Sequence, residues 1–533
     1  MIRITNLQLP LDHDEQALNQ AILARLSIQA ADLLDFVVYR RGYDARKKSK
    51  IVLIYTLDVT TNQDEHLLSK FADDQLIKTS PDMSYKFVAQ APAVVTDRPI
   101  VIGFGPCGLL IGLVLAQMGY KPIILERGAA VRQRTKDTFG FWRKKVLNTE
   151  SNVQFGEGGA GTFSDGKLYS QVKDSKHYSR KVLNEFVEAG APEEILFVSK
   201  PHIGTFRLVS MVEKMRATIE ALGGEIRFDT RVDDVHIEDG HLTGVTLAGG
   251  EVLKSRHIAL AVGHSARDTF KMLFDKKVYI EAKPFSIGFR IEHPQSQIDK
   301  ARFGANAGNE ILGAADYKLV HHCKNGRSVY SFCMCPGGTV VAATSEEGQV
   351  VTNGMSQYSR AERNANSAIV VGIDPSDYPG DALAGIELQR QLERKAYVMG
   401  GENYDAPAQT VGDFLKGKPS QALGKVESSF KPGIKLTDLS DALPDYCIAA
   451  IREAIPVFER KVKGFALADA LLTGVETRTS APICIKRDKD LQSVNTRGLF
   501  PAGEGAGYAG GIMSAAIDGI KIAEAMALSM NKA

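Results

Sequence analysis

The chain has 533 residues, of which 44% are hydrophobic and 24% are charged, and its formal net charge is +2. This length exceeds what one hydrophobic core supports, so we expect several domains of an ordinary globular protein. The small net charge argues against nucleic acid or a membrane surface as the main partner, and no apolar run approaches the roughly 20 residues of a membrane helix.

The first residues and the cysteines indicate a cytoplasmic protein. The opening sequence, MIRITNLQLPLDHDE, lacks the basic start and the long apolar core of a signal peptide. The six cysteines are too few and too scattered for a disulfide framework. We therefore expect a reduced protein that does not enter a membrane.

Residues 1–95 are predicted to form a separate ferredoxin-like α+β domain. Apolar spacing predicts strands at 1–9, 33–40, 51–59 and 85–89, with helices at 14–26 and 66–73. This βαββαβ order is that of a split βαβ unit. The basic stretch RRGYDARKKSK between the middle strands is typical of either a phosphate or RNA contact or a solvated hairpin tip. We favour the hairpin tip and expect no nucleic-acid partner, because the rest of the domain is not basic.

Residues 98–128, RPIVIGFGPCGLLIGLVLAQMGYKPIILERG, predict a dinucleotide-binding βαβ unit. A short apolar strand enters a G-x-G-x-x-G turn, an apolar helix follows, and the second strand ends at Glu126. We expect the turn, Gly103, Gly105, Pro106 and Gly108, to hold a pyrophosphate and Glu126 to accept ribose hydroxyls. The motif leaves FAD and NAD open. Glu126 would repel the 2′-phosphate of NADP, although the neighbouring Arg127 weakens that argument.

Residues 155–168, FGEGGAGTFSDGKL, contain too much glycine for a helix or strand interior. Their bare N–H groups suit a cofactor or another anion, and the candidate contacts are Gly158, Gly159, Gly161 and Thr162. The alternative is a flexible surface loop. Further along, a strand at 224–235, a β-meander at 241–253 and a buried strand that ends at Gly263 are predicted.

Residues 283–489 are predicted to form another domain, rich in strands at its start. Histidines and cysteines gather there, at His321, His322, Cys323, Cys333 and Cys335. An Asn325-Gly326 hairpin that pairs Cys323 with Ser328 separates these side chains, so we expect no metal site. Cys333 and Cys335 are either a redox-active thiol pair or, as we favour, buried structural cysteines.

Residues 496–526, TRGLFPAGEGAGYAGGIMSAAIDGIKIAEAM, form the second decisive stretch. A strand leads into Gly503 and Glu504, and Gly510 and Gly511 open an apolar helix that begins at Ile512. If the ligand is a flavin, the partial positive charge of this helix would stabilise negative charge on it. Two helix N-termini, far apart in sequence and both free of side chains, predict that one long cofactor is bound at both of its ends.

The chain resembles the glutathione-reductase-like flavoproteins with two dinucleotide-binding domains, and most closely a little-characterised bacterial family of FAD-dependent dehydrogenases. The resemblance covers most of residues 98–533. The motifs that carry it are GFGPCG, the Glu126 acid, NVQFGEGGAGTFSDGKL, KPHIGT, CMCPGG, ETRTSAP and LFPAGEGAGYAGGI. It implies an α/β fold with a discontinuous Rossmann-like FAD-binding domain at 98–282 and 490–533, and an inserted α+β substrate domain at 283–489.

The same resemblance implies the FAD contacts. The pyrophosphate would lie on Gly103–Gly108 and the ribose on Glu126. Adenine would meet Val232, the ribityl phosphate or hydroxyls Gly503 and Glu504, and the ring Gly511 and Ile512. Many relatives have Asp where this chain has Glu504, and the longer side chain keeps the sign of the contact.

Two absences limit the predicted chemistry. The sequence GEGGAG at 156–161 is not followed by an apolar helix, so we find no convincing second dinucleotide motif, and NAD(P)H stays open as the electron donor. No Cys-x-x-x-x-Cys pair is present, which disfavours disulfide reductase chemistry.

We expect an FAD-dependent oxidoreductase that transfers a hydride or electrons to or from an unidentified small molecule. The alternative is a flavin-binding protein with structural FAD, whose N-terminal domain recruits nucleic acid or protein. Lys167, His202 and Arg478 lie in motifs near the expected ring, but each fits a structural ion pair equally well, so no catalytic residue is assigned.

Overall fold

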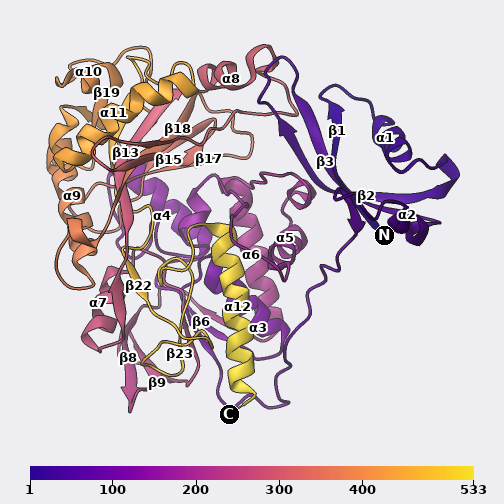
Figure 1. The fold of residues 1–533 in the computed structure, drawn as a ribbon. Helices are drawn as coiled ribbons and strands as arrows, with labels where there is room; N and C mark the ends of the chain where they lie inside the picture. Colours follow the sequence, from indigo (N-terminus) through magenta and orange to yellow (C-terminus); the bar gives the residue numbers. More distant parts are fainter. Residues whose placement is uncertain (533) are drawn as a thin grey trace.

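The computed structural model describes residues 1–532, in which three larger sheets fall within the three predicted domains (Figure 1). The N-terminal sheet stands to one side, and the other two sheets stack one above the other in the main body. Among the described residues, no helix has both the length and the apolar character needed to cross a membrane.

The N-terminal sheet has four antiparallel strands in the order β2-β3-β1-β4, which is the order of a ferredoxin-like unit. Its elements are β1 (Ile2–Pro10), α1 (Ala17–Leu26), η1 (Ala30–Asp32), β2 (Leu33–Asp44), β3 (Val52–Thr61), α2 (Asp64–Lys70) and β4 (Ile77–Thr79). The predicted fourth strand at 85–89 is wrong. Tyr85 packs instead against the core of the neighbouring unit and donates a hydrogen bond to Glu524 Oε1 at 3.0 Å.

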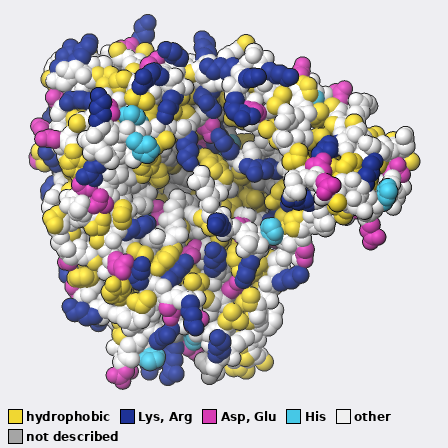
Figure 2. Space-filling model, viewed as in Figure 1, with side chains coloured by type: hydrophobic (Ala, Val, Ile, Leu, Met, Phe, Trp, Pro, Cys, Tyr) yellow, Lys and Arg dark blue, Asp and Glu magenta, His cyan; other side chains and the backbone are white. Residues whose placement is uncertain are grey.

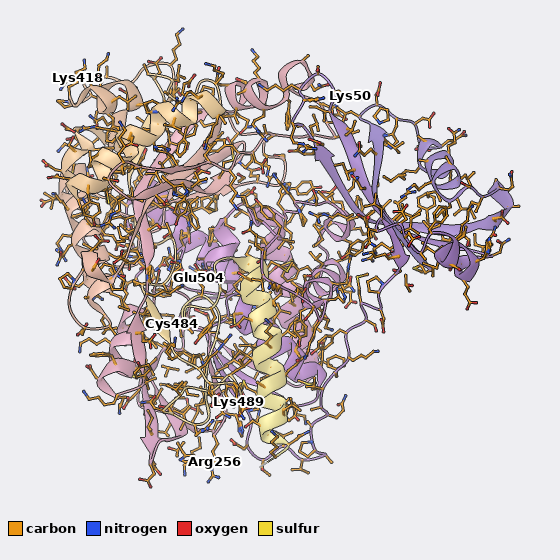
Figure 3. All side chains as sticks on the ribbon, viewed as in Figure 1. Lys50, Arg256, Lys418, Cys484, Lys489 and Glu504 are labelled. Atoms are coloured by element: carbon orange, nitrogen blue, oxygen red, sulfur yellow. The ribbon has the colours of Figure 1, made fainter. Side chains whose placement is uncertain are left out.

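The hairpin between β2 and β3 joins the N-terminal unit to the main body (Figure 3, Lys50). The Asn306 side chain donates to the Lys48 carbonyl at 3.0 Å, and Ile51 is buried in the core of the seven-stranded sheet. The Arg41 N–H donates to the Phe197 carbonyl at 2.6 Å. The basic stretch is therefore an exposed tip on a docked hairpin.

The second sheet is parallel, with the order β23-β11-β5-β6-β7. Its strands are β5 (Ile100–Ile102), β6 (Ile123–Leu125), β7 (Glu225–Arg227), β11 (Ile258–Leu260) and β23 (Leu499–Pro501). Alternate residues of one strand face opposite layers, as the period of a β-strand requires. Val101 points into a core that helices build, whereas Ile100 and Ile102 point into a core shared with a small antiparallel sheet.

Helices and the small sheet complete this three-layer arrangement (Figure 1). The helices are α3 (Pro106–Gln117), α4 (Val131–Lys144), α5 (Tyr178–Glu188), α6 (Thr205–Ala221), α7 (Arg267–Asp275) and α12 (Ile512–Met530), with short turns η2 (Ala160–Phe163) and η3 (Glu193–Leu196). The small sheet contains β8 (Val232–Glu238), β9 (His241–Leu247) and β10 (Val252–Lys254). The single strand predicted at 224–235 is therefore two strands, separated by a turn at which Asp229 has a φ of 51°.

The third sheet has seven strands in the order β14-β15-β18-β13-β21-β19-β20. These are β13 (Phe285–Pro294), β14 (Val320–His322), β15 (Ser328–Cys335), β18 (Asn364–Ile373), β19 (Ala406–Thr410), β20 (Ile434–Leu436) and β21 (Leu471–Glu476). A separate hairpin is formed by β16 (Gly338–Ala342) and β17 (Thr352–Ser356). The helical segments of this part are α8 (Gln295–Phe303), η4 (Gly304–Asn306), η5 (Pro375–Asp377), α9 (Ala384–Gly400), α10 (Val411–Lys416), η6 (Leu439–Asp441) and α11 (Asp445–Lys461).

The two passages between the parallel sheet and the third sheet lie side by side. The outgoing strand β12 (Ile280–Ala282) pairs antiparallel with the returning strand β22 (Ile483–Ile485). The chain therefore leaves and re-enters the parallel sheet at one place, which explains how β23 can pair with β11 although the two are far apart in sequence.

Candidate functional site

A cavity of about 620 Å³ lies at the carboxyl ends of β5, β6 and β11. Its wall includes Gly103 and Gly105 after β5, Glu126 after β6, and Gly263 after β11. Figure 2 shows the surface hollowed where α12 begins, with Lys and Arg side chains around the hollow. Open α/β sheets bind ligands at this edge, and the volume lies within the range of small-molecule sites.

The N-termini of α3 and α12 both open into this cavity. Gly105 precedes α3 and Gly511 precedes α12, and neither residue places a side-chain hydrogen bond on the first turn. The unpaired N–H groups and the helix dipoles make both ends attractive to negative charge. A Cβ atom on Gly510 or Gly511 would meet nothing within 4 Å. These residues fit the long, anionic cofactor that the motifs predict.

Most of the predicted cofactor contacts line the cavity: Gly103, Gly105, Pro106, Glu126, Arg127, Gly159, Gly161, Val232, Gly263, Glu504, Gly510, Gly511 and Ile512. Four others, Gly108, Gly158, Thr162 and Gly503, lie behind its wall. A Cβ on Gly108 would meet the Gly103 carbonyl oxygen at 1.9 Å, and one on Gly158 would meet Thr162 Oγ1 at 2.2 Å. The Gly503 N–H donates to Asp518 at 2.8 Å. These four therefore shape the wall.

Glu126 accepts hydrogen bonds from the backbone. Its buried carboxylate accepts the N–H of Phe104 at 2.8 Å on one oxygen and the N–H groups of Gly128 and Gly156 at 2.9 Å on the other. A carboxylate has about four acceptor positions. One position is not used by these groups, and the contact of Glu126 with the ribose hydroxyls stays a prediction.

Arg127 is held by neighbouring carboxylates. Its guanidinium pairs with Glu150 and with Asp268 at 2.9 Å each, and it stacks over the Phe155 ring at 4.2 Å. Its charge is therefore matched by two carboxylates, which restores the argument that Glu126 disfavours a 2′-phosphate here.

A buried arginine that the sequence interpretation missed holds the glycine-rich loop. Arg134 is fully buried on α4 and donates to four backbone carbonyls, those of Asn152, Val153, Gly156 and Glu157, at 2.7–3.2 Å. Burial lowers the pKa of Arg134 to about 10. The segment VRQRTKDTFGFWRK carries several basic residues, and nothing in its spacing marks this one as internal.

Charged groups from the glycine-rich loop and the third sheet form the wall of the cavity that lies opposite the two glycine turns. Lys167 Nζ lies 3.0 Å from Asp165 Oδ2, and Arg360 grips the same carboxylate at 2.6 and 2.9 Å. Burial acts to raise the pKa of Asp165, but the charges of Lys167 and Arg360 outweigh it and hold that pKa below its usual range. Glu476 also lines the cavity, 3.0 Å from Arg290, and burial raises its pKa to about 7.

Glu504 and His264 meet at the centre of the molecule (Figure 3, Glu504). Burial raises the pKa of Glu504 to about 7. Burial, with the charges of Arg478 and Arg267, lowers the pKa of His264 to about 3, so this imidazole is neutral. His264 Nε2 lies 4.0 Å from Glu504 Oε1. The cavity therefore holds carboxyl groups that change protonation near neutral pH, as acid–base chemistry requires.

The three residues considered near the ring separate in the structure. Lys167 and Arg478 line the cavity, whereas His202 does not. His202 Nε2 lies 3.0 Å from the Tyr358 carbonyl and its ring stacks on Tyr358. Arg478 is held 2.8 Å from Glu393 and donates to Ser345 at 2.6 Å, in a buried network. Lys167 keeps unused N–H donors, so it is the best placed of the three to meet a ligand.

The hairpin register predicted for the histidine and cysteine cluster is wrong by one residue. Cys323 donates its N–H to Arg327, because the loop contains three residues and Gly326 takes a φ of 82°. His321 and Cys323 meet Glu453 of α11, with ligand atoms within 4.8 Å of one another. This group has the geometry to hold a metal ion, and the absence of a metal stays a prediction.

Comparisons with known proteins agree with these observations. Residues 284–479 match the family described as FAD-dependent protein, C-terminal domain-like, and residues 1–60 match a domain of unknown function. A Clostridium beijerinckii protein described as an uncharacterized protein is 46% identical over 531 residues, which cover 98% of each chain.

Two solved structures match the chain at low similarity. One is a 3-ketosteroid-delta4-(5alpha)-dehydrogenase from Rhodococcus jostii, with 12% identity, a TM-score of 0.36, and coverage of 82% of this chain and 99% of that chain. The other is a glycine oxidase from Geobacillus kaustophilus, with 10% identity, a TM-score of 0.33, and coverage of 82% and 94%.

Proposed function

Because this chain belongs to the family of FAD-dependent flavoproteins and FAD is its cofactor, we propose that it is an oxidoreductase that exchanges a hydride or electrons with a small molecule. One observation carries the proposal. Two uncapped helix N-termini and a wall of titratable side chains border the same cavity. FAD, when bound, supplies a ring that takes up or gives up two electrons.

The glycine turns would hold the two ends of the cofactor. The first turn of α3, next to Gly105, would bind the pyrophosphate through its free N–H groups. Glu126 would accept one ribose hydroxyl with its remaining acceptor position. The first turn of α12, after Gly511, would hold the ring end and favour negative charge there.

The side chains opposite would receive the substrate. Glu476 and Glu504, with pKa values of about 7, would hold or release a proton at the substrate near neutral pH. Lys167 contributes a positive charge to the same wall and would orient an anionic or carbonyl-bearing substrate. The division of the chain at residues 95, 282 and 489 is part of this proposal, with the third sheet as the substrate-binding part.

The glycine-rich loop would support the first dinucleotide turn and would not form a second one. The Gly158 N–H donates to the Phe104 carbonyl at 2.8 Å, and the loop continues as the short turn η2. It is therefore a support for the first site. NAD(P)H stays a candidate electron donor that would have to bind in the open part of the cavity.

Anaerobic mixing of the purified holoprotein with NADH, NADPH or dithionite tests the proposal. We expect a nicotinamide to bleach the visible flavin band within seconds, and an added oxidant to restore it. Bleaching by dithionite alone would exclude both nicotinamides as donors and favour a protein with structural FAD and a recruitment role for the N-terminal unit. Free FAD mixed with the same nicotinamides is the control for uncatalysed reduction.

A further inference from the structure

Two cysteines stand at the wall of the cavity where β15 departs from regular geometry. Phe332 pairs with Ala368 and Cys335 with Asn366, so the strand contains one extra residue at this point. A bulge of this kind redirects a side chain. Cys333 takes a left-handed φ of 43° and lines the cavity, while Cys335 is fully buried behind it.

The bulge turns the Cys335 thiol back towards Cys333. In a regular strand, residues two apart have Cα atoms roughly 6.5 Å from each other, at the long limit for a disulfide. Here the Cys335 thiol turns back towards Cys333 and donates to the Cys333 carbonyl oxygen at 3.4 Å. A structural core cysteine needs neither a left-handed backbone, which costs about 1–3 kcal/mol, nor access to a cavity.

Positive charge surrounds the pair. Arg290 is fully buried, donates to the Cys333 carbonyl at 2.6 Å and lies 3.6 Å from Cys335 Sγ. The hydrogen bond from Cys335, together with the charges of Lys167 and Arg290, holds the pKa of Cys333 well below its ordinary value although burial opposes this. The pKa of Cys335 is raised by the same hydrogen bond and by burial. The other titratable or charged groups that act on the pair or respond to it are Asp165, Tyr317, Arg360, Glu476 and Glu504.

We propose that Cys333 and Cys335 form a redox-active dithiol, in which Cys333 is the attacking sulfur and Cys335 the resolving sulfur, and that its substrates are disulfides small enough to enter the cavity. This site lies on the third sheet and does not use the Cys-x-x-x-x-Cys arrangement that the chain lacks. It goes beyond the proposed oxidoreductase function, because thiol exchange needs no electrons from FAD.

The exchange balances without a further reactant. The Cys333 thiolate attacks one sulfur of RSSR, so a Cys333–SR bond forms and RS⁻ leaves. The Cys335 thiol then gives its proton to the first RS⁻ and attacks the Cys333 sulfur. The Cys333–Cys335 bond forms and a second RS⁻ leaves. The dithiol is thereby oxidised by two electrons, and RSSR is reduced to one RSH and one RS⁻, which takes a proton from water.

The test uses the purified holoprotein with 4,4′-dithiodipyridine, a small disulfide whose released thione is coloured. We expect a fast phase that releases two thiones per chain and leaves a Cys333–Cys335 disulfide in the unreduced peptide map. At pH 6 this phase should be about tenfold faster than the reaction of the unfolded chain, because more of Cys333 is thiolate although a low pKa weakens the nucleophile.

Variants assign the two roles. Cys335→Ser should release one thione and retain a mixed disulfide on Cys333, and Cys333→Ser should lose the fast phase. Cys484→Ser is the matched control, since Cys484 is also partly exposed but has no thiol partner among the described residues, and its rate should equal that of the wild type. Lys167→Met should slow the reaction at pH 6 about tenfold, and Lys167→Arg should retain most of it.

A fast phase that survives Cys333→Ser, or a wild-type map with no Cys333–Cys335 disulfide, would overturn the proposal. If a variant fails to fold, the peptide map of the wild type alone tests whether the Cys333–Cys335 disulfide forms. Flavin content and flavin reduction are measured on the same sample. If the protein keeps a reducible flavin but shows no fast phase, only the dithiol proposal fails. If the fast phase occurs but the flavin is not reduced, the dithiol proposal stands and the proposed function is contradicted.

Discussion

A Cβ atom on Gly159 would lie 2.7 Å from the Cα of Gly105. The two glycines come from separate loops and touch backbone to backbone, and the Gly158 N–H donates to the Phe104 carbonyl beside them at 2.8 Å. The first dinucleotide turn and the glycine-rich loop are therefore one packed unit, and the shape of the cavity depends on both.

Gly159→Ala should separate these loops. The new methyl group would collide with backbone, which cannot rotate away as a side chain can, and alanine is disfavoured at the φ of 60° that Gly159 adopts. We expect a loss of about 1–3 kcal/mol in the free energy of unfolding and a loss of bound FAD. Thermal unfolding and the flavin absorbance of the purified protein measure the two effects.

Gly140→Ala is the matched control. Gly140 lies within α4, where a Cβ atom would meet nothing within 4 Å. Alanine should stabilise this helix by about 0.5–1 kcal/mol and leave the FAD content unchanged. Equal behaviour of the two variants would show that the contact between Gly105 and Gly159 is not important.

Arg134→Met should unfold the glycine-rich loop. The variant removes one donor from each of four buried carbonyl oxygens. The carbonyls of Gly156 and Glu157 keep hydrogen bonds from Gly159 and Thr162, whereas those of Asn152 and Val153 lose their donor. Each unsatisfied group costs about 1–3 kcal/mol unless water reaches it. We expect a loss of about 3 kcal/mol or more and rapid proteolysis within 148–168. Arg132→Met, two residues away and paired with Glu213 on the surface, should change stability by less than about 0.5 kcal/mol. A similar effect of both variants would contradict the role given to Arg134.

Glu126→Gln should lower the free energy of unfolding even when no cofactor is bound. The glutamine side chain has one oxygen acceptor where glutamate has two. At least one of the N–H groups of Phe104, Gly128 and Gly156 would therefore face an NH₂ group. We expect a loss of about 1–3 kcal/mol in FAD-stripped protein. Glu150→Gln, at a half-exposed carboxylate, is the control. An unchanged unfolding midpoint for Glu126→Gln would show that the carboxylate serves the ligand alone.

Glu504 should make stability depend on pH. Burial raises its pKa from 4.5 to about 7, so the folded chain keeps a proton that the unfolded chain loses between pH 4.5 and 7, and stability falls as the pH rises through that window. A quarter of the Glu504 side chain is exposed, which screens part of the cost. Glu504→Gln should therefore be about 1 kcal/mol more stable than the wild type at pH 8 and equal to it at pH 4. A difference that does not vary with pH would contradict this assignment.

The sequence predicted the features whose signal is local. The glycine spacing at Gly103–Gly108 and at Gly510–Gly511 marks two strand-to-helix turns, and both are present. Their meeting at one cavity followed from the length of the expected cofactor, and the structure brings the two turns to the same wall. Glu126 was placed at the correct strand end, because the acid of this motif follows the second strand directly.

The features that depend on long-range packing could not be predicted. Tyr85 lies in a segment that looks like a strand, but its ring packs on a neighbouring core. The bulge at Cys333 arises from pairing with Asn366 and Ala368 on another strand, and no local pattern announces it. Arg134 resembles the exposed basic residues beside it, and only the tertiary fold shows which one is internal.

The binding of FAD and of ADP to stripped protein shows whether the two glycine turns hold opposite ends of one FAD. Gly105→Ala and Gly510→Ala add a methyl group to the cavity wall without a backbone clash, since the nearest atoms lie at 3.5 Å or beyond 4 Å. We expect the wild-type protein to bind one FAD per chain. Both variants should weaken the binding of FAD by about tenfold or more, and only Gly105→Ala should weaken the binding of ADP. FAD binding that is unaffected by either substitution, or ADP binding that responds to Gly510→Ala, would show that the two turns do not hold opposite ends of one FAD.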